Sequence, residues 1–215
     1  MQVIVICNKK VGVGKSTCTA LLSLAAVRDN KKVILIDLDP QKTLEKWWNK
    51  RKELTPCLAD VSTENFSSKI ELMEREGFDY VFIDTLGDLS NIPHEAIKFA
   101  NLAIIPCKPT STDLEAIGRT ISMVKEAKKN FIFVLCQAIS RSNIMFKAAS
   151  ILSEYGIVAP TVMINRIAYV TSMHTASCVS KFSDIAGSEI QQIWEFIKNK
   201  LNVEDKTNGQ KKEKF

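Results

Sequence analysis

The sequence lacks several features that would assign it to a specialised class of protein. Only 8 glycines and 6 prolines occur among 215 residues, which excludes a collagen-like chain, and 46% of residues are apolar, which excludes a wholly disordered one. No apolar run approaches the roughly 20 residues of a membrane-spanning helix. The first apolar stretch has no basic residues before it, as a signal peptide would have. We therefore expect a cytoplasmic globular protein of one domain.

Closely spaced metal ligands are also absent. The six cysteines are scattered without a Cys-x-x-Cys pair, and only His94 and His174 could supplement them. Zinc and iron–sulfur sites require close pairs of ligands, so the pattern argues against a metal–thiolate centre. Most of the cysteines lie in apolar runs, and we expect them to be buried as small apolar side chains.

Positive charge is unevenly distributed along the chain. The net charge is +5, yet the stretch from Arg119 to Lys181 holds eight basic residues against two acidic ones, so the remainder is close to neutral. A basic surface in one half of a protein suggests a polyanionic partner. Solvated, lysine-rich helix faces explain the same composition, and the charge alone does not decide between them.

Short apolar runs alternate with helical patterns over most of the sequence. Nearly continuous apolar runs are typical of strands buried on both faces. Strand–helix–strand repetition predicts the α/β class, with a mostly parallel central sheet flanked by helices on both faces in three layers. The expected strands are residues 3–7, 32–37, 79–84, 102–107, 131–136 and 160–164, and the expected helices are 15–28, 44–52, 92–99, 114–129, 146–155 and 188–201.

The last expected helix sets the end of the expected domain. Apolar residues recur on one stripe from Ile190 to Leu201, as in a helix that packs on its own domain. Residues 202–215 are polar and have no periodicity, which predicts a disordered tail. We therefore expect a single domain over residues 1–201.

The most informative segment is Asn-Lys-Lys-Val-Gly-Val-Gly-Lys-Ser-Thr, residues 8–17, which follows the first strand and opens the first helix. Backbone amides in such a loop, together with the positive end of the helix dipole, cradle phosphate oxygens. In this setting Lys15 would reach the β- and γ-phosphates, and the Ser16 hydroxyl would bind Mg²⁺. Lys9 occupies the first glycine position of the usual pattern. The expected nucleotide-binding residues here are Lys10, Val11, Gly12, Val13, Gly14, Lys15, Ser16 and Thr17.

Residues 10–16, KVGVGKS, resemble the deviant Walker A loop, KGGxGK[ST], of the ParA/MinD family of P-loop ATPases. The resemblance implies a P-loop NTPase fold and makes Lys10 the signature lysine, which crosses the interface of an ATP-bound dimer to the partner's phosphates. A second cation there would stabilise charge in the transition state. The family usually has glycine in place of Val11, and a β-branched residue would cost about 1–2 kcal/mol there if the position needed a positive φ.

Two further motifs contribute carboxylates at strand ends. Residues 37–41, Asp-Leu-Asp-Pro-Gln, match the family's DxDPQ element, and residues 78–84 have the form of a Walker B strand that ends in aspartate. The resemblance implies that Asp39 positions the attacking water, that Asp37 supports the Mg²⁺ shell and that Asp84 holds Mg²⁺ through water. A carboxylate that ends a parallel strand faces the crevice where ligands bind in open α/β sheets.

Three downstream segments extend the resemblance to about residues 1–200. The glycine-containing segment 85–90 is similar to that of small ParF-type members, where Gly87 would sense the γ-phosphate, while Asp88 fits a switch or a simple turn. Residues 105–113 resemble the family's PxxPSxxD segment, and we expect Asp113 to cap the next helix. Asn165 and Arg166 resemble the segment with adenine contacts and DNA-binding arginines.

Taken together, the resemblance implies a partition ATPase of the short ParF type, because the chain begins directly at its first strand. Lys10, Lys15 and Asp39 would be catalytic, with ATP and Mg²⁺ as cofactors and weak hydrolysis until a partner stimulates it. The partners implied are a second copy of the chain, double-stranded DNA bound without sequence preference, and a centromere-binding adaptor that is ParB-like or a ribbon-helix-helix protein. Nucleoid association would follow in the ATP state. The DNA-binding candidates are Arg141, Lys147, Arg166 and Lys181.

Two alternatives remain open at this stage. A MinD-like positioning ATPase would insert a C-terminal amphipathic helix into the lipid interface, but the polar residues after Leu201 make the last helix internal, and we expect no stable membrane association. A P-loop small-molecule ligase would need additional substrate loops, for which no unassigned polar segment is long enough.

Overall fold

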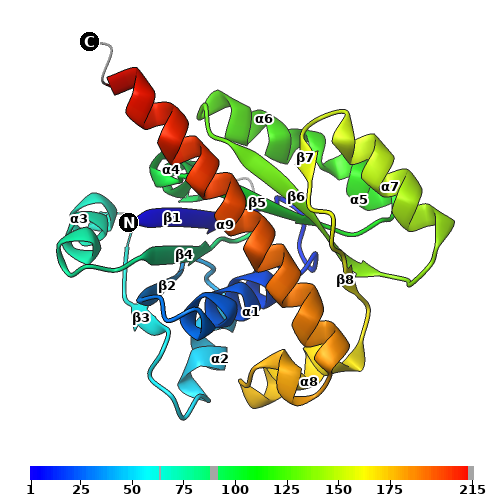
Figure 1. Ribbon diagram of the computed structural model, residues 1–215, viewed down its shortest axis with the longest axis horizontal. Helices are drawn as coiled ribbons and strands as arrows, with labels where there is room; N and C mark the ends of the chain where they lie inside the picture. The colour runs from blue at the N-terminus through cyan, green and yellow to red at the C-terminus, as the bar shows by residue number, and fades with distance from the viewer. Residues whose placement is uncertain (63, 88–91, 213–215) are drawn as a thin grey trace.

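A sheet of eight strands forms the centre of the molecule (Figure 1). The structure is a computed structural model that describes residues 1–62, 64–87 and 92–212. Along the sheet the order is β3-β2-β4-β1-β5-β6-β7, with β8 paired to β6, and every pairing between these strands is parallel. The strands are β1 (Gln2–Ile6), β2 (Val33–Asp37), β3 (Cys57–Ala59), β4 (Tyr80–Asp84), β5 (Leu102–Cys107), β6 (Phe131–Ala138), β7 (Ile157–Val158) and β8 (Met163–Ile164).

Helices cover both faces of this sheet, as the α/β prediction required. One face carries α1 (Lys15–Arg28), α2 (Thr43–Asn49), α8 (Ile167–Thr175), the short 3-10 helix η1 (Val179–Lys181) and α9 (Asp184–Lys212). The other carries α3 (Phe66–Arg75), α4 (Ile92–Phe99), α5 (Ser111–Ala116), α6 (Gly118–Glu126) and α7 (Asn143–Ser153). In Figure 1, α1 and α9 lie side by side in front of the sheet. The three-layer architecture is therefore confirmed.

The central strands are apolar throughout because each contributes to two cores. In β1, Ile4 and Ile6 belong to the cluster under α1 and α9, whereas Val3 and Val5 belong to the cluster on the opposite face. Full burial of such a side chain stabilises a fold by roughly 1.5–3 kcal/mol. The strand ends are thereby fixed, and so is the position of the loops that leave them.

Several elements differ from the expected ones. The helix expected over residues 114–129 is two helices, α5 and α6, which meet at Ile117. The short strands β3 and β7 lie at the two edges of the sheet, where brief pairing leaves little pattern in the sequence. Helix α3 was not predicted, although Phe66, Ile70 and Met73 are buried at positions i, i+4 and i+7, as an amphipathic helix requires.

The C-terminal helix packs its apolar stripe against its own domain, as expected. Trp194 is fully buried and packs edge-on against Tyr80 at 4.9 Å between ring centroids, and its Nε1 donates to Asp29 at 2.8 Å. In contrast to the disordered tail expected from residue 202, α9 continues to Lys212. Extending a helix that is already docked is far easier than nucleating one, so polar residues suffice. Within the described residues, none of the helices combines the length and apolarity needed to cross a membrane.

Candidate functional site

The loop between β1 and α1 lies at the carboxyl edge of the sheet, and two glycines shape it. Gly12 has φ +76° and Gly14 has φ +102°, a left-handed conformation that costs other residues roughly 1–2 kcal/mol. Val11 has no positive φ and is 76% exposed. The valine in place of the family's usual glycine therefore causes no left-handed strain.

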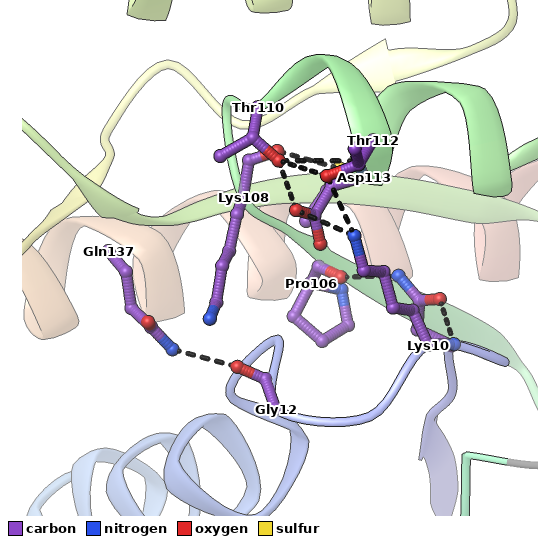
Figure 2. A network of polar contacts seen from close by, with 10 residues as sticks. Lys10, Gly12, Pro106, Lys108, Thr110, Thr112, Asp113 and Gln137 are labelled. Carbon is purple, nitrogen blue, oxygen red and sulfur yellow. Dashed lines mark hydrogen bonds and ion pairs between the residues drawn. The ribbon is translucent and has the colours of Figure 1, made fainter.

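Side chains from β6 and from the loop itself hold this loop in shape. The Asn8 amide donates to the Pro106 carbonyl at 2.8 Å, and its Oδ1 accepts from the backbone N–H of Lys10 at 2.8 Å. Gln137 donates to the Gly12 carbonyl at 3.1 Å (Figure 2). These bonds tie the loop to β5 and β6 and leave α1 to begin directly at Lys15.

Lys15 places its ammonium group inside the loop. The residue is only 7% exposed, and its Nζ donates to the carbonyl of Lys10 at 3.1 Å. Burial lowers the pKa of Lys15, and the nearby carboxylates of Asp84 and Asp39 oppose that shift. A methyl group at Gly87 would lie 2.8 Å from this Nζ, so the segment after β4 packs directly on the loop.

Two neighbouring strands, β2 and β4, deliver the three predicted carboxylates to one edge. Asp37 and Asp84 are register partners on β2 and β4, and Asp84 is also paired with Ile6, the last residue of β1 before the loop. Asp39 follows two residues after β2. Parallel strands end at the same edge of a sheet, so the three aspartates lie at the edge that carries the phosphate loop. Asp84 and Asp39 are the carboxylates that act on the Lys15 ammonium.

Asp84 is the most perturbed of these groups. It is fully buried, and burial raises its pKa to about 7, against the opposing effect of a hydrogen bond from Ser16. The Thr19 hydroxyl donates to its Oδ1 at 3.5 Å. Its Oδ2 has no hydrogen-bond partner among the described residues. One oxygen of a buried acid is thus left without the neutralising contact that such a group ordinarily has.

Asp37 and Asp39 have different surroundings. Asp37 is buried, which raises its pKa, and its two carboxylate oxygens accept from the backbone N–H groups of Asp39 at 3.0 Å and Glu45 at 2.9 Å. It therefore fixes the start of α2. Asp39 is half-buried and accepts from the Gln41 N–H at 2.8 Å, which leaves its second oxygen for other contacts.

These donors fit a magnesium ion that is shared with a phosphate group. Within the described ranges no cluster of three or more His, Cys, Asp or Glu side chains could hold a metal on its own. Mg²⁺ usually binds through one or two carboxylates together with water and substrate phosphates. The unpartnered Oδ2 of Asp84 beside the Ser16 hydroxyl meets that requirement.

Lys10 makes an ion pair within its own subunit (Figure 2). Its Nζ lies 3.0 Å from Asp113 Oδ2 and donates to Thr112 Oγ1 at 3.2 Å. The prediction that Asp113 caps α5 is wrong: Thr110 is the capping residue, and its Oγ1 accepts from the Asp113 N–H. Asp113 lies in the first turn of α5 instead, and its carboxylate faces Lys10.

A cavity of about 350 Å³ opens beside the loop, between Gly14 and α8. Its walls are largely apolar, with Cys136, Met163 and Tyr169 among them, and Asn165 lies at its lining. Thr17 faces it from the first turn of α1. The cavity thus continues from the end of the phosphate loop and has the size and apolar character of a site for a planar base.

Arg166 lines the same cavity but is held by a neighbour. Its Nε and NH2 groups bond to Glu189 Oε1 at 3.0 and 2.7 Å, and the Tyr169 hydroxyl donates to Glu189 Oε2 at 2.6 Å. Glu189 is 8% exposed. This arginine therefore fixes α8 against α9. Sequence patterns do not predict that role, because Glu189 lies 23 positions further along the chain.

The other basic candidates lie on separate elements. Arg141 is exposed in the β6–α7 connection and Lys147 is exposed on α7, whereas Lys181 is exposed on η1. Helix α7 and η1 belong to opposite layers of the sheet. The structure brings Arg141 and Lys147 onto one side and leaves Lys181 on the other.

Gln137 is the site residue that sequence reasoning missed. It has a positive φ of 54°, at a register irregularity between Cys136 and Ala138 where β6 pairs with β8. Bulges of this kind often re-aim a side chain beside an active site. A glutamine within an apolar strand is the one signal in the sequence that could have identified it.

Comparison with known proteins places most of the chain in one family. The model of a family described as CobQ/CobB/MinD/ParA nucleotide binding domain matches residues 4–170. The chain is 32% identical over 139 residues to the protein virC1 of Rhizobium radiobacter, covering 59% of this chain and 57% of virC1. It is 28% identical over 131 residues to the protein ParA of the same organism, covering 60% of this chain and 59% of that one. The chain therefore matches less than two thirds of the length of either relative.

Among solved structures, the chain is similar in fold to the septum site-determining protein MinD of Pyrococcus horikoshii, which was solved in complex with Mg-ADP. The TM-score is 0.73 at 16% identity, with 91% of this chain and 95% of MinD covered. At this identity the likeness concerns the fold.

Proposed function

The chain belongs to the CobQ/CobB/MinD/ParA nucleotide binding domain family, and from this premise we propose that it is a ParA-type partition ATPase. One observation carries the proposal: a glycine-shaped loop that holds the Lys15 ammonium lies against carboxylates at the ends of the two neighbouring strands, β2 and β4. This arrangement supports binding of a nucleoside triphosphate with Mg²⁺ and hydrolysis of its terminal phosphate. We propose that residues 1–201 act together as this ATPase domain.

Each residue of the site has a distinct task in this proposal. Lys15 and the backbone amides of residues 10–17 bind the phosphates, and the apolar cavity near Asn165 receives the base. Ser16 and Asp84 hold Mg²⁺, with Asp37 fixing the strand end beside them; the bound ion neutralises charge that develops on the phosphate oxygens. The free oxygen of Asp39 orients the attacking water.

We further propose that ATP joins two subunits face to face, with Lys10 of each reaching the nucleotide of the other. Exposed apolar side chains support this: Val11 in the loop is 76% exposed, and Ile167 and Val170 on α8, the helix that borders the cavity, are 78% and 62% exposed. Exposed apolar groups that cluster around a site are typical of an interaction surface. Hydrolysis would be weak until a centromere-binding adaptor, ParB-like or of the ribbon-helix-helix type, stimulates it.

The dimer would bind double-stranded DNA through phosphate contacts and would associate with the nucleoid in the cytoplasm. Arg141 and Lys147 remain the best candidates for these contacts, because both are exposed. Lys181 would contribute from the other layer of the sheet. Arg166 is a weaker candidate, because its guanidinium is already paired with Glu189. The buried stripe of α9 supports partition over a MinD-like attachment to lipid, which would need that stripe to be exposed.

DNA retention tests this proposal. With a non-hydrolysable ATP analogue, the protein should retain a random-sequence duplex at low salt and lose it by about 0.5 M salt, because each phosphate contact releases counterions. Arg141→Ala combined with Lys147→Ala should weaken retention about equally for every sequence, and Lys69→Ala on α3 is the matched control. Retention that is unchanged at high salt, or absent at low salt with and without nucleotide, would contradict DNA binding.

A further inference from the structure

Lys10 is held in its own chain by contacts of its side chain and of its backbone. Its ammonium pairs with Asp113 and bonds to Thr112, while its carbonyl accepts from the Lys15 ammonium. Figure 2 shows the side chain folded back toward α5, on the side away from Gly12. A lysine in this position points at its own chain and is not extended toward a second subunit.

The Asp113 carboxylate is buried and needs a cation beside it. The carboxylate is 5% exposed, and the Lys10 side chain is 32% exposed. Thr110 donates to Asp113 Oδ2, while Oδ1 is buried without a partner among the described residues. If Lys10 departed, the acid would be left buried with one neutral donor, which is costly. The pair therefore holds Lys10 more firmly than an exposed ion pair would.

The second contact links this pair to the phosphate-binding lysine. Lys15 reaches the Lys10 carbonyl at 3.1 Å, and Gly87 packs so closely over both that an added methyl would lie 3.1 Å from that carbonyl. A phosphate group that attracted the Lys15 ammonium would remove its bond to Lys10. The Lys10 backbone would then lose the bond at its carbonyl and keep the bond from its N–H to Asn8 Oδ1.

We propose that Asp113 is a positioning residue that holds Lys10 in its own subunit, and that phosphate binding at Lys15 releases it toward the partner's nucleotide. The inference rests on the proposed function, because it presumes that Lys10 acts across a dimer. It goes beyond the proposed function in two respects. Asp113 is the group that keeps the monomer from assembling, and the bond from Lys15 to the Lys10 carbonyl is the contact through which nucleotide is sensed. Asp113 would thus set how much nucleotide-free protein is ready to dimerise.

Chemical labelling of the Lys10 amine tests whether Asp113 holds Lys10 in its own subunit, and it does not require a dimer. In the nucleotide-free protein, Asp113→Asn should raise the rate of acylation at Lys10 about threefold, measured by peptide mass spectrometry, and Thr112→Val should raise it less because the ion pair remains. Glu71→Gln removes an equal charge from an exposed ion pair on α3 and should leave the rate unchanged. Added ADP, which offers phosphates to Lys15, should raise the rate in the parent protein and not further in Asp113→Asn.

Dimer formation with a non-hydrolysable ATP analogue tests whether a released Lys10 reaches the partner's nucleotide. Because both subunits must release a lysine, a threefold gain in each lowers the dimer Kd of Asp113→Asn about tenfold. In a Lys10→Ala background the same substitution should leave the protein monomeric with the analogue. That dependence on Lys10 separates positioning from a structural role, because a structural effect of Asp113→Asn would change assembly in either background.

Three results would overturn the inference: unchanged Lys10 labelling in Asp113→Asn, a weaker dimer in that variant, or an effect that persists without Lys10. A weaker dimer would mean that Asp113 receives Lys10 across the interface. If the parent protein stays monomeric with the analogue, the proposed dimer fails, whereas the labelling results still decide whether Asp113 holds Lys10.

Discussion

At the scale of single residues, Asp84 and Lys15 show how the fold keeps opposite charges available for a ligand. Asp84 has a raised pKa because it is buried, and Lys15 has a lowered pKa for the same reason. Among charged groups, each is the one that most opposes the pKa shift of the other. Groups with such perturbed pKa values are typical of functional sites rather than of structural cores.

Asp84 should make the stability of the protein depend on pH. Its folded pKa of about 7 lies above its ordinary value of 3.8, so its contribution is fully present below about pH 4 and is lost as pH rises through 7. Between about pH 5.5 and pH 8 the free energy of unfolding should fall by about 2 kcal/mol from this group. Asp84→Asn should remove that slope.

Urea unfolding at the two pH values measures this effect in the nucleotide-free protein. Glu71→Gln on α3 is a suitable control, because its carboxylate is exposed. If the free energy of unfolding of Asp84→Asn fell as steeply with pH as that of the parent protein, Asp84 would not be the source of the pH dependence.

At the scale of elements, residues 85–87 after β4 pack against the phosphate loop through Gly87. At Gly87 a methyl group would lie 2.8 Å from Lys15 Nζ and 3.1 Å from the Lys10 carbonyl. A backbone contact this close must move to accommodate a side chain, whereas at Gly118 a methyl group meets nothing within 4 Å. Asp88, which the sequence also singled out, lies outside the described residues.

Gly87→Ala should therefore weaken nucleotide binding without unfolding the protein. We expect the Kd for MgATP, measured by calorimetry, to rise about tenfold, a change of roughly 1.4 kcal/mol. Gly118→Ala should bind with the parent Kd. Equal affinities for the two variants would mean that the segment after β4 does not constrain Lys15.

The central elements could be predicted from the sequence because they carry strong local signals. The strands around β1 are buried on both faces and read as continuous apolar runs, and the loop at Gly12 and Gly14 has a backbone that only glycine adopts easily. The three aspartates were predictable because parallel strands bring their carboxyl ends to one edge.

The remaining features depend on contacts between distant segments. The bond from Lys10 to Thr112, beside the ion pair with Asp113, joins positions 102 apart, and the bond from Gln137 to Gly12 joins positions 125 apart. No local pattern in the sequence predicts a partner so far along the chain. The local pattern at Asp113 instead predicted a helix cap. The extension of α9 beyond Leu201 was likewise missed, because composition says little about a helix that is already anchored.

At the scale of the whole molecule, the proposed function requires two lysine cations at each triphosphate. Lys15 lies inside the phosphate loop of its own chain, whereas Lys10 is paired with Asp113. A second cation on the triphosphate would stabilise charge in the transition state. In the proposed dimer that cation is Lys10 of a second copy, so assembly and hydrolysis depend on the same lysine.

The molar mass in solution tests this claim most directly. Multi-angle light scattering with Mg²⁺ and a non-hydrolysable ATP analogue should give twice the monomer mass for the parent protein, and the monomer mass with ADP. Lys10→Ala should stay monomeric with the analogue, while still binding it through Lys15. A parent protein that remains monomeric with saturating analogue, or a Lys10→Ala variant that dimerises as well as the parent, would contradict the account.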